Sequence, residues 1–273
     1  MYAQKYKQKV LYLMRIALVT GASSGLGAEY VRLIDKKEYV DEIWVVARRE
    51  KRLKELQEKC VTPVRMLCLD LSTSSDLATL RNKLSVAANS SQDFQIKLLI
   101  NAAGFGKFAN TEDLSENEIN SMIALNCTAL VEITRMCLFY MNHGSRIIEF
   151  ASSAAFQPLQ GLSIYAASKS FVLSFTRSLR RECKGRGIYI SAVCPIWVKT
   201  EFIKVARESK DGTSVKHPWP KISAKRVVKW SNFLNRLNYP VICCSPFSFL
   251  MRVFGKIIPA PVTMWVWEGL RKI

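Results

Sequence analysis

The stretch LVTGASSGLGAEY, residues 18–30, decides the fold of this chain. It starts within the apolar run RIALVT (15–20), which is typical of a strand buried on both faces, and it ends in a helical pattern. Gly21 permits a tight turn, while Gly25 and Gly27 let the backbone approach a pyrophosphate and let the helix pack close to the strand. Because a helix N-terminus attracts negative charge, this loop predicts a dinucleotide-binding unit.

The rest of the chain repeats the alternation of short apolar runs with longer helical patterns. The further runs are DEIWVVAR (41–48), VRMLCLD (64–70), IKLLIN (96–101), SRIIEFAS (145–152) and GIYISAVC (187–194). Helical patterns such as KRLKELQEK, ENEINSMIALNCTALVEITRMCLF and KSFVLSFTRSLRREC lie between them. Six such alternations predict a doubly wound α/β domain with a parallel sheet, in which ligands bind beyond the carboxyl ends of the strands. YPVIC (239–243) is a candidate seventh strand, and the polar segment 207–221 is interpreted as a surface excursion.

The composition is that of a globular chain with an excess of positive charge. Its 273 residues are 49% hydrophobic and 23% charged, which suits one large domain. The formal net charge of +18 is compatible with nucleic acid, an anionic membrane surface or a phosphate-bearing ligand, and charge alone does not choose among them.

Cysteine and histidine usage argues against disulfides and metal ions. The 8 cysteines contain no CxxC pair and most lie in apolar runs, which favours a reducing cytosol. His143 and His217 are the only histidines, so no metal site is expected. Arg15 interrupts the apolar run that follows the basic start, so we expect no signal peptide. We also find no uninterrupted apolar stretch of about 18–20 residues, the length that spans a bilayer.

The end of the second apolar run bears on the choice of cofactor. Ala47 is followed by Arg48 and Arg49, where an acidic residue would bind the ribose 2′-hydroxyl of NAD(H). Guanidinium groups suit a 2′-phosphate, so the pair favours NADP(H) over NAD(H). A merely basic helix start is the alternative, which the helix dipole disfavours. Asp70, with Leu71 beside it, is placed to accept a hydrogen bond from the adenine amino group or to cap the next helix.

The stretch SIYAASKS (163–170) places Tyr165 and Lys169 four positions apart, on one face of a helix. Alone, this pair could be a solvated surface feature. It is one of several motifs that resemble the short-chain dehydrogenase/reductase family, in order from about residue 15 to residue 202. These motifs are TGASSGLG (20–27), NAAG (101–104), Asn126, the serines of ASSAAF (151–156), YAASK (165–169) and PIWVKTEF (195–202).

The resemblance implies a single Rossmann-like domain with a parallel sheet of about seven strands, assembled as a homodimer or homotetramer. It divides the chain into a basic N-terminal appendage (1–13), a Rossmann-like catalytic domain (14–245) and an apolar, aromatic C-terminal extension (246–273). The extension is interpreted as a lid that also touches a membrane surface, or as an ordinary packing segment or dimer contact.

The resemblance also implies roles for the catalytic residues. Tyr165 would exchange a proton with the substrate oxygen, and the Lys169 ammonium would lower the pKa of the phenol and hold the nicotinamide ribose. Ser152, with Ser153 as the alternative one residue on, would hydrogen-bond the reacting oxygen. Asn126 would join a proton relay to Lys169, and a buried amide that only bonds backbone is the alternative.

A larger set is implied to bind the cofactor. It comprises Gly21, Ser23, Ser24, Gly25, Leu26, Gly27, Arg48, Arg49, Asp70, Leu71, Asn101, Ala102, Gly104, Tyr165, Lys169, Pro195, Val198 and Thr200. Two positions depart from the family pattern. Ala102 replaces the second asparagine of NNAG, a mild change because this segment acts largely through its backbone. Ile196 replaces the usual glycine after Pro195, and because isoleucine disfavours positive φ, we expect the backbone or the wall beside the nicotinamide to differ.

These features together predict an NADPH-dependent oxidoreductase that acts on a carbonyl or secondary alcohol. The apolar extension favours a lipophilic substrate, such as a steroid-like ketone or an acyl derivative. The alternative is a catalytically idle Rossmann scaffold that uses its basic surface to bind nucleic acid or an anionic membrane. Because the whole set of Asn126, Ser152, Tyr165 and Lys169 is present, we expect no nucleic-acid partner. The expected location is the cytoplasm, with peripheral membrane contact through the extension.

Overall fold

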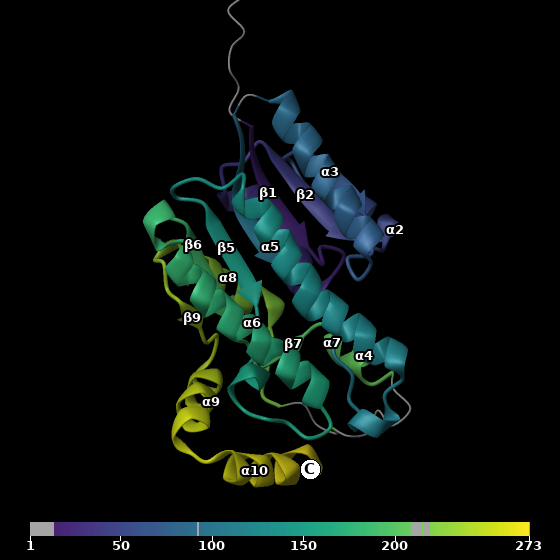
Figure 1. Cartoon of the computed structure of the whole chain (residues 1–273), viewed down its shortest axis with the longest axis vertical. Coiled ribbons are helices and arrows are strands. Elements are labelled where there is room, and N and C mark those ends of the chain that lie inside the picture. Colours follow the sequence, from purple (N-terminus) through teal and green to yellow (C-terminus); the bar gives the residue numbers. More distant parts are fainter. Residues whose placement is uncertain (1–13, 92, 209–214, 216–218, 273) are drawn as a thin grey trace, which may run out of the picture.

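A computed structural model describes residues 14–91, 93–208, 215 and 219–272 of the chain (Figure 1). The predicted appendage, residues 1–13, lies outside the described residues, as does much of the surface excursion predicted after the sixth strand.

Seven parallel strands form the central sheet, in the order β3-β2-β1-β4-β5-β6-β9. They are β1 (Met14–Thr20), β2 (Glu42–Ala47), β3 (Val64–Cys68), β4 (Phe94–Asn101), β5 (Arg146–Phe150), β6 (Tyr189–Val193) and β9 (Val241–Ile242). All six predicted strands and the candidate seventh are confirmed, and so is the doubly wound α/β class. The order reverses between β1 and β4, which is where such sheets open a ligand crevice.

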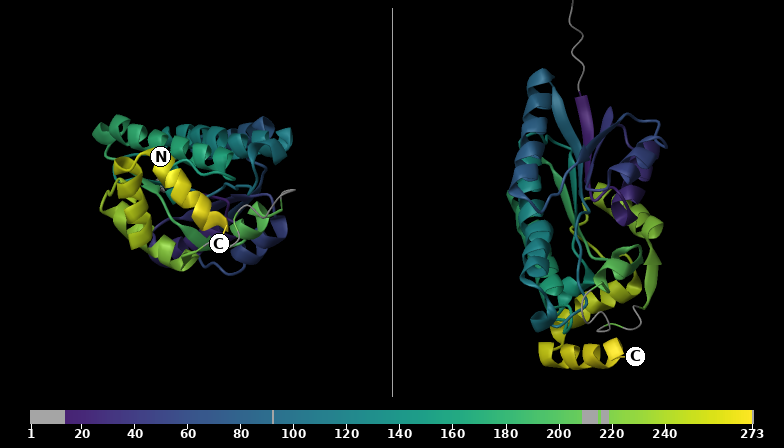
Figure 2. Two further views of the ribbon diagram at one scale, coloured as in Figure 1. Left: turned by 90° about the horizontal axis from the view of Figure 1, so that it is seen from below. Right: turned by 90° about the vertical axis from the view of Figure 1, so that its right-hand side faces the viewer.

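Helices cover both faces of the sheet (Figure 2). One face carries α3 (Ser74–Ser90), α5 (Leu130–Leu138) and α6 (Ser163–Glu182), and the other carries α1 (Gly25–Lys37), α2 (Glu50–Gln57) and α8 (Ala224–Arg236). Alternate side chains of β1 pack against the helices on opposite faces of the sheet. Ile16 and Leu18 belong to one core cluster, and Ala17 and Val19 belong to the other. Burial on both faces explains why the strands are continuous apolar runs.

One long helix runs through α4 (Glu116–Ile123), a π-helical turn (Ala124–Ala129) and α5. By length and composition alone, its 23 residues could cross a membrane. Polar residues such as Asn120 and Asn126 interrupt it, so it is not the uninterrupted apolar stretch that the sequence was expected to lack. In this fold, 44% of its apolar window is buried, and α5 packs on the sheet. The π-helical turn carries Asn126, at a position typical of functional sites.

The remaining elements lie beyond the carboxyl ends of the main strands (Figures 1 and 2). They are the short parallel pair β7 (Trp197–Lys199) and β8 (Lys221–Ser223), then α7 (Phe202–Ala206), α9 (Pro246–Ile257), α10 (Ala260–Lys272) and the 3-10 turns η1 (Thr111–Asp113) and η3 (Ser153–Phe156). A further 3-10 turn, η4 (Lys184–Arg186), lies between α6 and the amino end of β6. The C-terminal extension is thus a pair of helices. Gly255 lets α9 approach η3 closely, because a Cβ there would lie 2.4 Å from the Phe156 carbonyl oxygen.

Candidate active site

The glycine-rich turn brings α1 against the ends of β1 and β4. Gly21 has a φ of +66°, and a Cβ on it would lie 2.8 Å from the Ala102 carbonyl oxygen. A Cβ on Gly27 would lie 2.4 Å from the Gly21 carbonyl oxygen, so only glycine allows this packing. The N-cap Ser24 makes no side-chain capping bond, which leaves the first N–H groups of α1 without that partner. The turn therefore has the form of a phosphate cradle.

A buried polar network supports the floor of the cleft. The Thr20 hydroxyl oxygen accepts hydrogen bonds from the backbone N–H groups of Ala102 and Ala103, both at 3.1 Å. The Asn101 side chain is 2% exposed and donates to Thr134 at 2.9 Å and to a Glu149 carboxylate oxygen at 3.2 Å. Asn101 thus lies beneath the cleft with its side chain turned into the fold, where it positions the loop that follows β4.

Tyr165 and Lys169 lie on one face of α6, as their spacing predicts. The Lys169 Nζ is 5.8 Å from the centroid of the Tyr165 ring and donates to the Phe150 carbonyl oxygen at 2.8 Å. Ser152 follows β5, accepts a hydrogen bond from the Ala154 N–H at 3.1 Å, and lines the same cavity as Tyr165. Since the Ser153 side chain is buried and this residue donates its N–H to Pro195, the geometry favours Ser152 over the alternative.

Asn126 is fully buried and reaches the loop after β4. Its amide accepts from the Phe105 N–H at 3.1 Å and donates to the Phe105 carbonyl oxygen at 2.8 Å and to the Ser168 hydroxyl at 3.1 Å. A Cβ on Gly104 would lie 2.9 Å from Asn126 Oδ1 and 3.4 Å from Lys169 Nζ. Gly104 therefore keeps open the space between the amide and the ammonium, which is where a relay between them would run.

Burial shifts the pKa values of Tyr165 and Lys169 in opposite directions. Burial raises the pKa of Tyr165 to about 12, and the hydrogen bond from Ser152 opposes the rise. Burial also lowers the pKa of Lys169 to about 8. The predicted lowering of the Tyr165 pKa is wrong for this structure, because burial raises this pKa more than the Ser152 hydroxyl lowers it. Tyr165 therefore keeps its proton at neutral pH, as a proton donor must.

The two adjacent arginines after β2 separate. Arg48 pairs with Asp70 at 3.5 Å, while the Asp70 carboxylate accepts from the Ser72 N–H at 3.0 Å and the Ser72 hydroxyl at 2.6 Å. Burial opposes ionisation of Asp70, but the Ser72 bonds and Arg48 outweigh it, so the pKa is lowered. Leu71 beside it is 3% exposed and packs in the core. The N-cap of α3 is Thr73, whose hydroxyl accepts from the Asp76 N–H at 3.3 Å, so the prediction that Asp70 caps this helix is wrong and the adenine contact stays a prediction.

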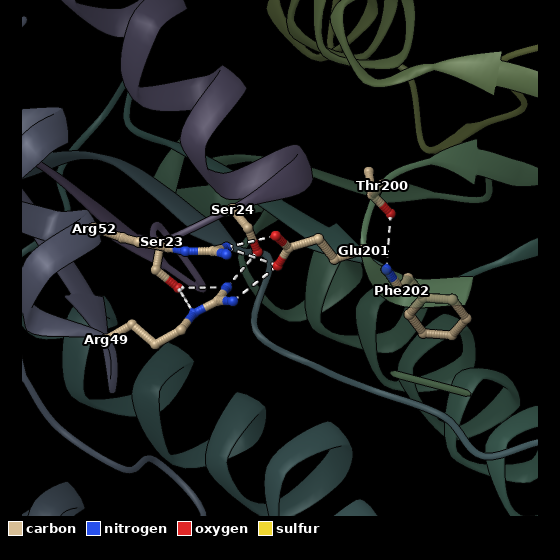
Figure 3. A network of polar contacts seen from close by, with 7 residues as sticks. All are labelled: Ser23, Ser24, Arg49, Arg52, Thr200, Glu201 and Phe202. Atoms are coloured by element: carbon tan, nitrogen blue, oxygen red, sulfur yellow. Dashed lines mark hydrogen bonds and ion pairs between the residues drawn. The ribbon is translucent and has the colours of Figure 1, made fainter. Parts of the chain in front are cut away.

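Arg49 turns the other way, toward the glycine-rich loop (Figure 3). Its guanidinium donates to the hydroxyls of Ser23 at 3.0 Å and Ser24 at 2.7 Å, and to the Glu201 carboxylate at 2.8 Å. Arg52 donates to both oxygens of Glu201 at 2.7 Å. Arg52 and Glu201 were not among the predicted site residues. Arg52 had a local signal, one helical turn beyond Arg49, whereas Glu201 is 149 positions from Arg52 and had none.

A cavity of about 660 Å³ lies between the candidate catalytic residues and the C-terminal helices. Of the predicted residues, it is lined by Leu26, Ala102, Gly104, Ser152, Tyr165, Lys169, Pro195, Val198 and Thr200. Most of its remaining wall is apolar and aromatic, including Phe202 of α7, Phe254 of α9 and Val266 of α10. The Trp267 indole donates to the Gln160 carbonyl oxygen at 3.0 Å and fixes α10 over the opening. No three His, Cys, Asp or Glu side chains are grouped as a metal site within the described part of the chain.

The departure at Ile196 is accommodated by packing. Its side chain is 9% exposed and joins the core cluster that contains Val193 and Val198. Asn238 is the only described residue other than glycine with positive φ, so the backbone at Ile196 does not adopt the conformation that glycine would allow. The Thr200 methyl packs near Gly25, where a Cβ would lie 3.2 Å from it. The wall of the cleft beside Pro195 is therefore bulkier than a glycine at this position would make it, which is one of the two outcomes expected from the sequence.

Comparison with known proteins bears directly on this arrangement. The family model for short chain dehydrogenase matches residues 15–211. The chain belongs to the short-chain dehydrogenase family. It is therefore an oxidoreductase of this family, and the resemblance in its sequence motifs is confirmed.

The sequence identities to individual relatives are low. The chain is 28% identical over 237 residues to a very-long-chain 3-oxoacyl-CoA reductase of Bos taurus, with 82% of this chain and 71% of that protein covered. It is 31% identical over 199 residues to sulfoacetaldehyde reductase 2 of Chromohalobacter salexigens, with 70% and 75% covered.

Solved structures agree on the fold. A short-chain dehydrogenase from Sphingobium yanoikuyae in complex with NADPH has a TM-score of 0.75 and 26% identity, covering 89% of this chain and 94% of that one. A short-chain dehydrogenase/reductase from Burkholderia phymatum in complex with NAD has a TM-score of 0.77, covering 93% and 96%, and at 18% identity it shows the fold alone.

Proposed function

We propose that this protein is an NADP(H)-dependent oxidoreductase that interconverts a carbonyl group and a secondary alcohol on a lipophilic substrate. Tyr165 is the acid/base, assisted by Ser152, Lys169 and Asn126. The observation that carries this proposal is that Ser152, Tyr165 and Lys169 together line the inner end of an apolar cavity that adjoins the phosphate cradle. A proton donor, a second hydrogen-bonding hydroxyl and room for an apolar molecule meet at that point.

The residues present fit a bound NADP(H). Glycines fill the places in the cradle where a Cβ would collide, and Arg49 and Arg52 converge beside Ser23 and Ser24. Such a pair of guanidinium groups suits a 2′-phosphate, and the Sphingobium yanoikuyae relative is a complex with NADPH. When bound, this cofactor supplies or accepts the hydride.

The chain's own residues manage the proton. In the direction of reduction, the protonated Tyr165 donates to the substrate oxygen, while the Ser152 hydroxyl stabilises the negative charge that develops on it. Lys169 and Asn126 flank the gap at Gly104 and can return a proton to the Tyr165 phenolate through that gap. With its pKa raised to about 12, Tyr165 is protonated at neutral pH, which is the state that carbonyl reduction requires.

Replacing Tyr165 with phenylalanine tests this function. Tyr165→Phe removes the proton donor, so turnover should fall by at least about a hundredfold while cofactor binding persists. The measurement is NADPH oxidation with a panel of ketones, with NADH run alongside and NADPH binding followed by fluorescence. Tyr189→Phe, at the other end of the sheet, is the matched control. Parental turnover by Tyr165→Phe would overturn the mechanism and leave the idle scaffold as the better account.

The cavity wall supports a lipophilic substrate. Cavities of this size hold ligands as large as drugs, and α9 and α10 contribute mainly apolar side chains to the lining. Phe254 and Phe249 both lie on α9 and are 48% and 51% exposed, but only Phe254 lines the cavity. They form a matched pair for testing this contact.

Phe254→Ala should raise KM for long-chain ketones by about tenfold, because an apolar contact worth about 1–2 kcal/mol is lost. Phe249→Ala should leave KM unchanged, and short ketones should be insensitive to both changes. Equal effects of the two substitutions would contradict a substrate site beneath α9.

Two further properties remain predictions. Trp265 of α10 and Ile257 of α9 are 75% and 74% exposed, which favours peripheral contact of these helices with a lipid surface. Co-sedimentation with liposomes tests that contact, and sedimentation velocity tests the expected homodimer or homotetramer.

A further inference from the structure

One carboxylate occupies both of the arginines that converge at the edge of the cradle. Glu201 precedes α7, and its two oxygens accept hydrogen bonds from Arg49 at 2.8 Å and Arg52 at 2.7 Å. Figure 3 shows the guanidinium groups reaching the carboxylate from one side, with Ser23 and Ser24 beside Arg49. The hydroxyls, guanidinium groups and carboxylate thus form one continuous network at the start of α1.

The charges of this network do not balance. Two guanidinium groups carry two positive charges, and Glu201 supplies one negative charge. A phosphate monoester carries about −1.5 to −2 at neutral pH and offers three acceptor oxygens, so it matches two guanidinium groups better than one carboxylate does. A ribose 2′-hydroxyl carries no charge and cannot compete for the arginines.

The existing ion pairs are weak enough to exchange. The side chains of Arg49, Arg52 and Glu201 are 44%, 41% and 43% exposed, so water screens their attraction. The hydrogen bonds from Arg49 and then Arg52 hold the pKa of Glu201 below its usual value, so the carboxylate is ionised at neutral pH. Glu201 therefore competes as an anion across the neutral pH range.

We propose that Glu201 is a specificity-determining residue that competes with the 2′-phosphate of the cofactor for Arg49 and Arg52. The inference rests on the proposed NADP(H)-dependent function and extends it in two ways. It assigns the phosphate to Arg49 and Arg52 instead of Arg48, which pairs with Asp70. It also predicts that the Glu201 carboxylate lowers the affinity for the 2′-phosphate without changing the affinity for the adenosine part of the cofactor.

The position of Glu201 connects the phosphate site to the substrate cavity. Thr200 lies against Gly25 on one side of Glu201, and on the other side the Phe202 ring is 5.3 Å from the Tyr165 ring, centroid to centroid. Release of the carboxylate frees the segment that holds Phe202 against Tyr165. Since coupling between binding sites is reciprocal, a bulky substrate that displaces Phe202 should also alter affinity for the phosphate.

The test measures binding of two cofactor fragments by titration calorimetry. Adenosine 2′,5′-bisphosphate carries the 2′-phosphate, and adenosine 5′-monophosphate lacks it. Glu201→Gln keeps the shape of the side chain and removes its charge. We expect it to bind the bisphosphate about threefold to tenfold more tightly and the monophosphate unchanged. Arg52→Ala should weaken only the bisphosphate.

The control is Glu132→Gln, which removes another exposed carboxylate paired with an arginine, Arg81, at 3.1 Å on α5. It should change neither affinity. Weaker or unchanged bisphosphate binding by Glu201→Gln, or an equal gain for both fragments, overturns the inference, because the carboxylate would then position the arginines or play no part.

The outcome also separates this inference from the proposed function, since neither fragment is a substrate. If the wild-type protein prefers the bisphosphate and Arg49→Ala loses that preference while Glu201→Gln has no effect, only the competition is wrong. If neither the wild-type protein nor Glu201→Gln prefers the bisphosphate, the proposed NADP(H) preference and the competition both fail.

Discussion

Two glutamates each form ion pairs with two arginines, and they lie at opposite ends of the strands of the central sheet. Glu38 follows α1 at the amino edge and pairs with Arg146 of β5 at 2.5 Å and Arg236 of α8 at 2.8 Å. Glu201 makes the same kind of cluster at the carboxyl edge, with Arg49 and Arg52. The Glu38 side chain is 9% exposed and that of Glu201 is 43% exposed. The same set of charged groups, one glutamate and two arginines, is thus buried in one cluster and exposed to water in the other.

The surroundings decide what each cluster can do. Asn232 donates to Glu38 at 3.1 Å and accepts from Arg146 at 3.0 Å, so a closed network ties α1, β5 and α8 together. Burial opposes ionisation of Glu38, but the arginines outweigh it and lower its pKa. At the other edge, water competes for every partner of Glu201. A buried cluster serves to fix helices on the sheet, and an exposed one remains available for a ligand.

The largest expected effect is the loss of the buried cluster. Glu38→Ala strands two cations, of which Arg146 is 9% exposed, and should lower the free energy of unfolding by about 3–5 kcal/mol. Glu201→Ala removes the same group from the exposed cluster and should cost less than about 1 kcal/mol. Urea denaturation followed by circular dichroism measures both. Equal losses would show that burial does not distinguish the two clusters.

Binding of the two adenosine phosphates provides a second comparison of the Glu38 and Glu201 clusters. Where Glu38→Ala remains folded, it should keep the affinities of the wild-type protein for both adenosine phosphates, since the amino edge is remote from the cradle. A change in the ratio of these affinities would mean that the two edges communicate, contrary to a purely structural role for Glu38.

Structural features that depend on a short segment of the chain could be predicted from the sequence. The glycine-rich turn, the buried strands and the Tyr165–Lys169 pair each depend on spacing within a few residues. For that reason the fold, and the position of Tyr165 and Lys169 on one face of a helix, could be predicted without coordinates. Even the candidate seventh strand, which is only two residues long in the structure, had the signature of a short apolar run.

Properties that arise from tertiary contact could not be predicted in this way. The sequence placed the Lys169 ammonium near the Tyr165 phenol, but it could not show that the Phe150 carbonyl accepts the ammonium hydrogen bond or that burial raises the pKa of Tyr165. The Arg52–Glu201 contact joins segments 149 positions apart, which no local pattern reveals. Arg48 and Arg49 are adjacent, and only the fold sends one to Asp70 and the other to the cradle.

Glu149 provides a third case for comparison. It is fully buried, whereas the Glu38 side chain is 9% exposed, and it has no arginine partner among the described residues. One carboxylate oxygen accepts from Thr134 and Asn101, while the other has no hydrogen-bond partner. Burial raises the pKa of Glu149 to about 7, and the bonds from Thr134 and Asn101 and the charge of Lys169 oppose the rise. The Cys137 thiol of α5 also interacts with it.

The pH dependence of stability should therefore have opposite signs for the two buried glutamates. Since the folded pKa of Glu149 exceeds its unfolded value, its contribution is fully present below about pH 4.5 and is lost as pH rises through about 7, a change of up to about 3 kcal/mol. Glu38, with a lowered pKa, loses its contribution as pH falls. Glu149→Gln should be more stable than the wild-type protein at pH 8 and nearly equal to it at pH 5, in urea denaturation at both values. Glu132→Gln, the exposed control, should follow the wild-type protein at both, and a Glu149→Gln difference independent of pH would mean that the carboxyl keeps one charge state throughout.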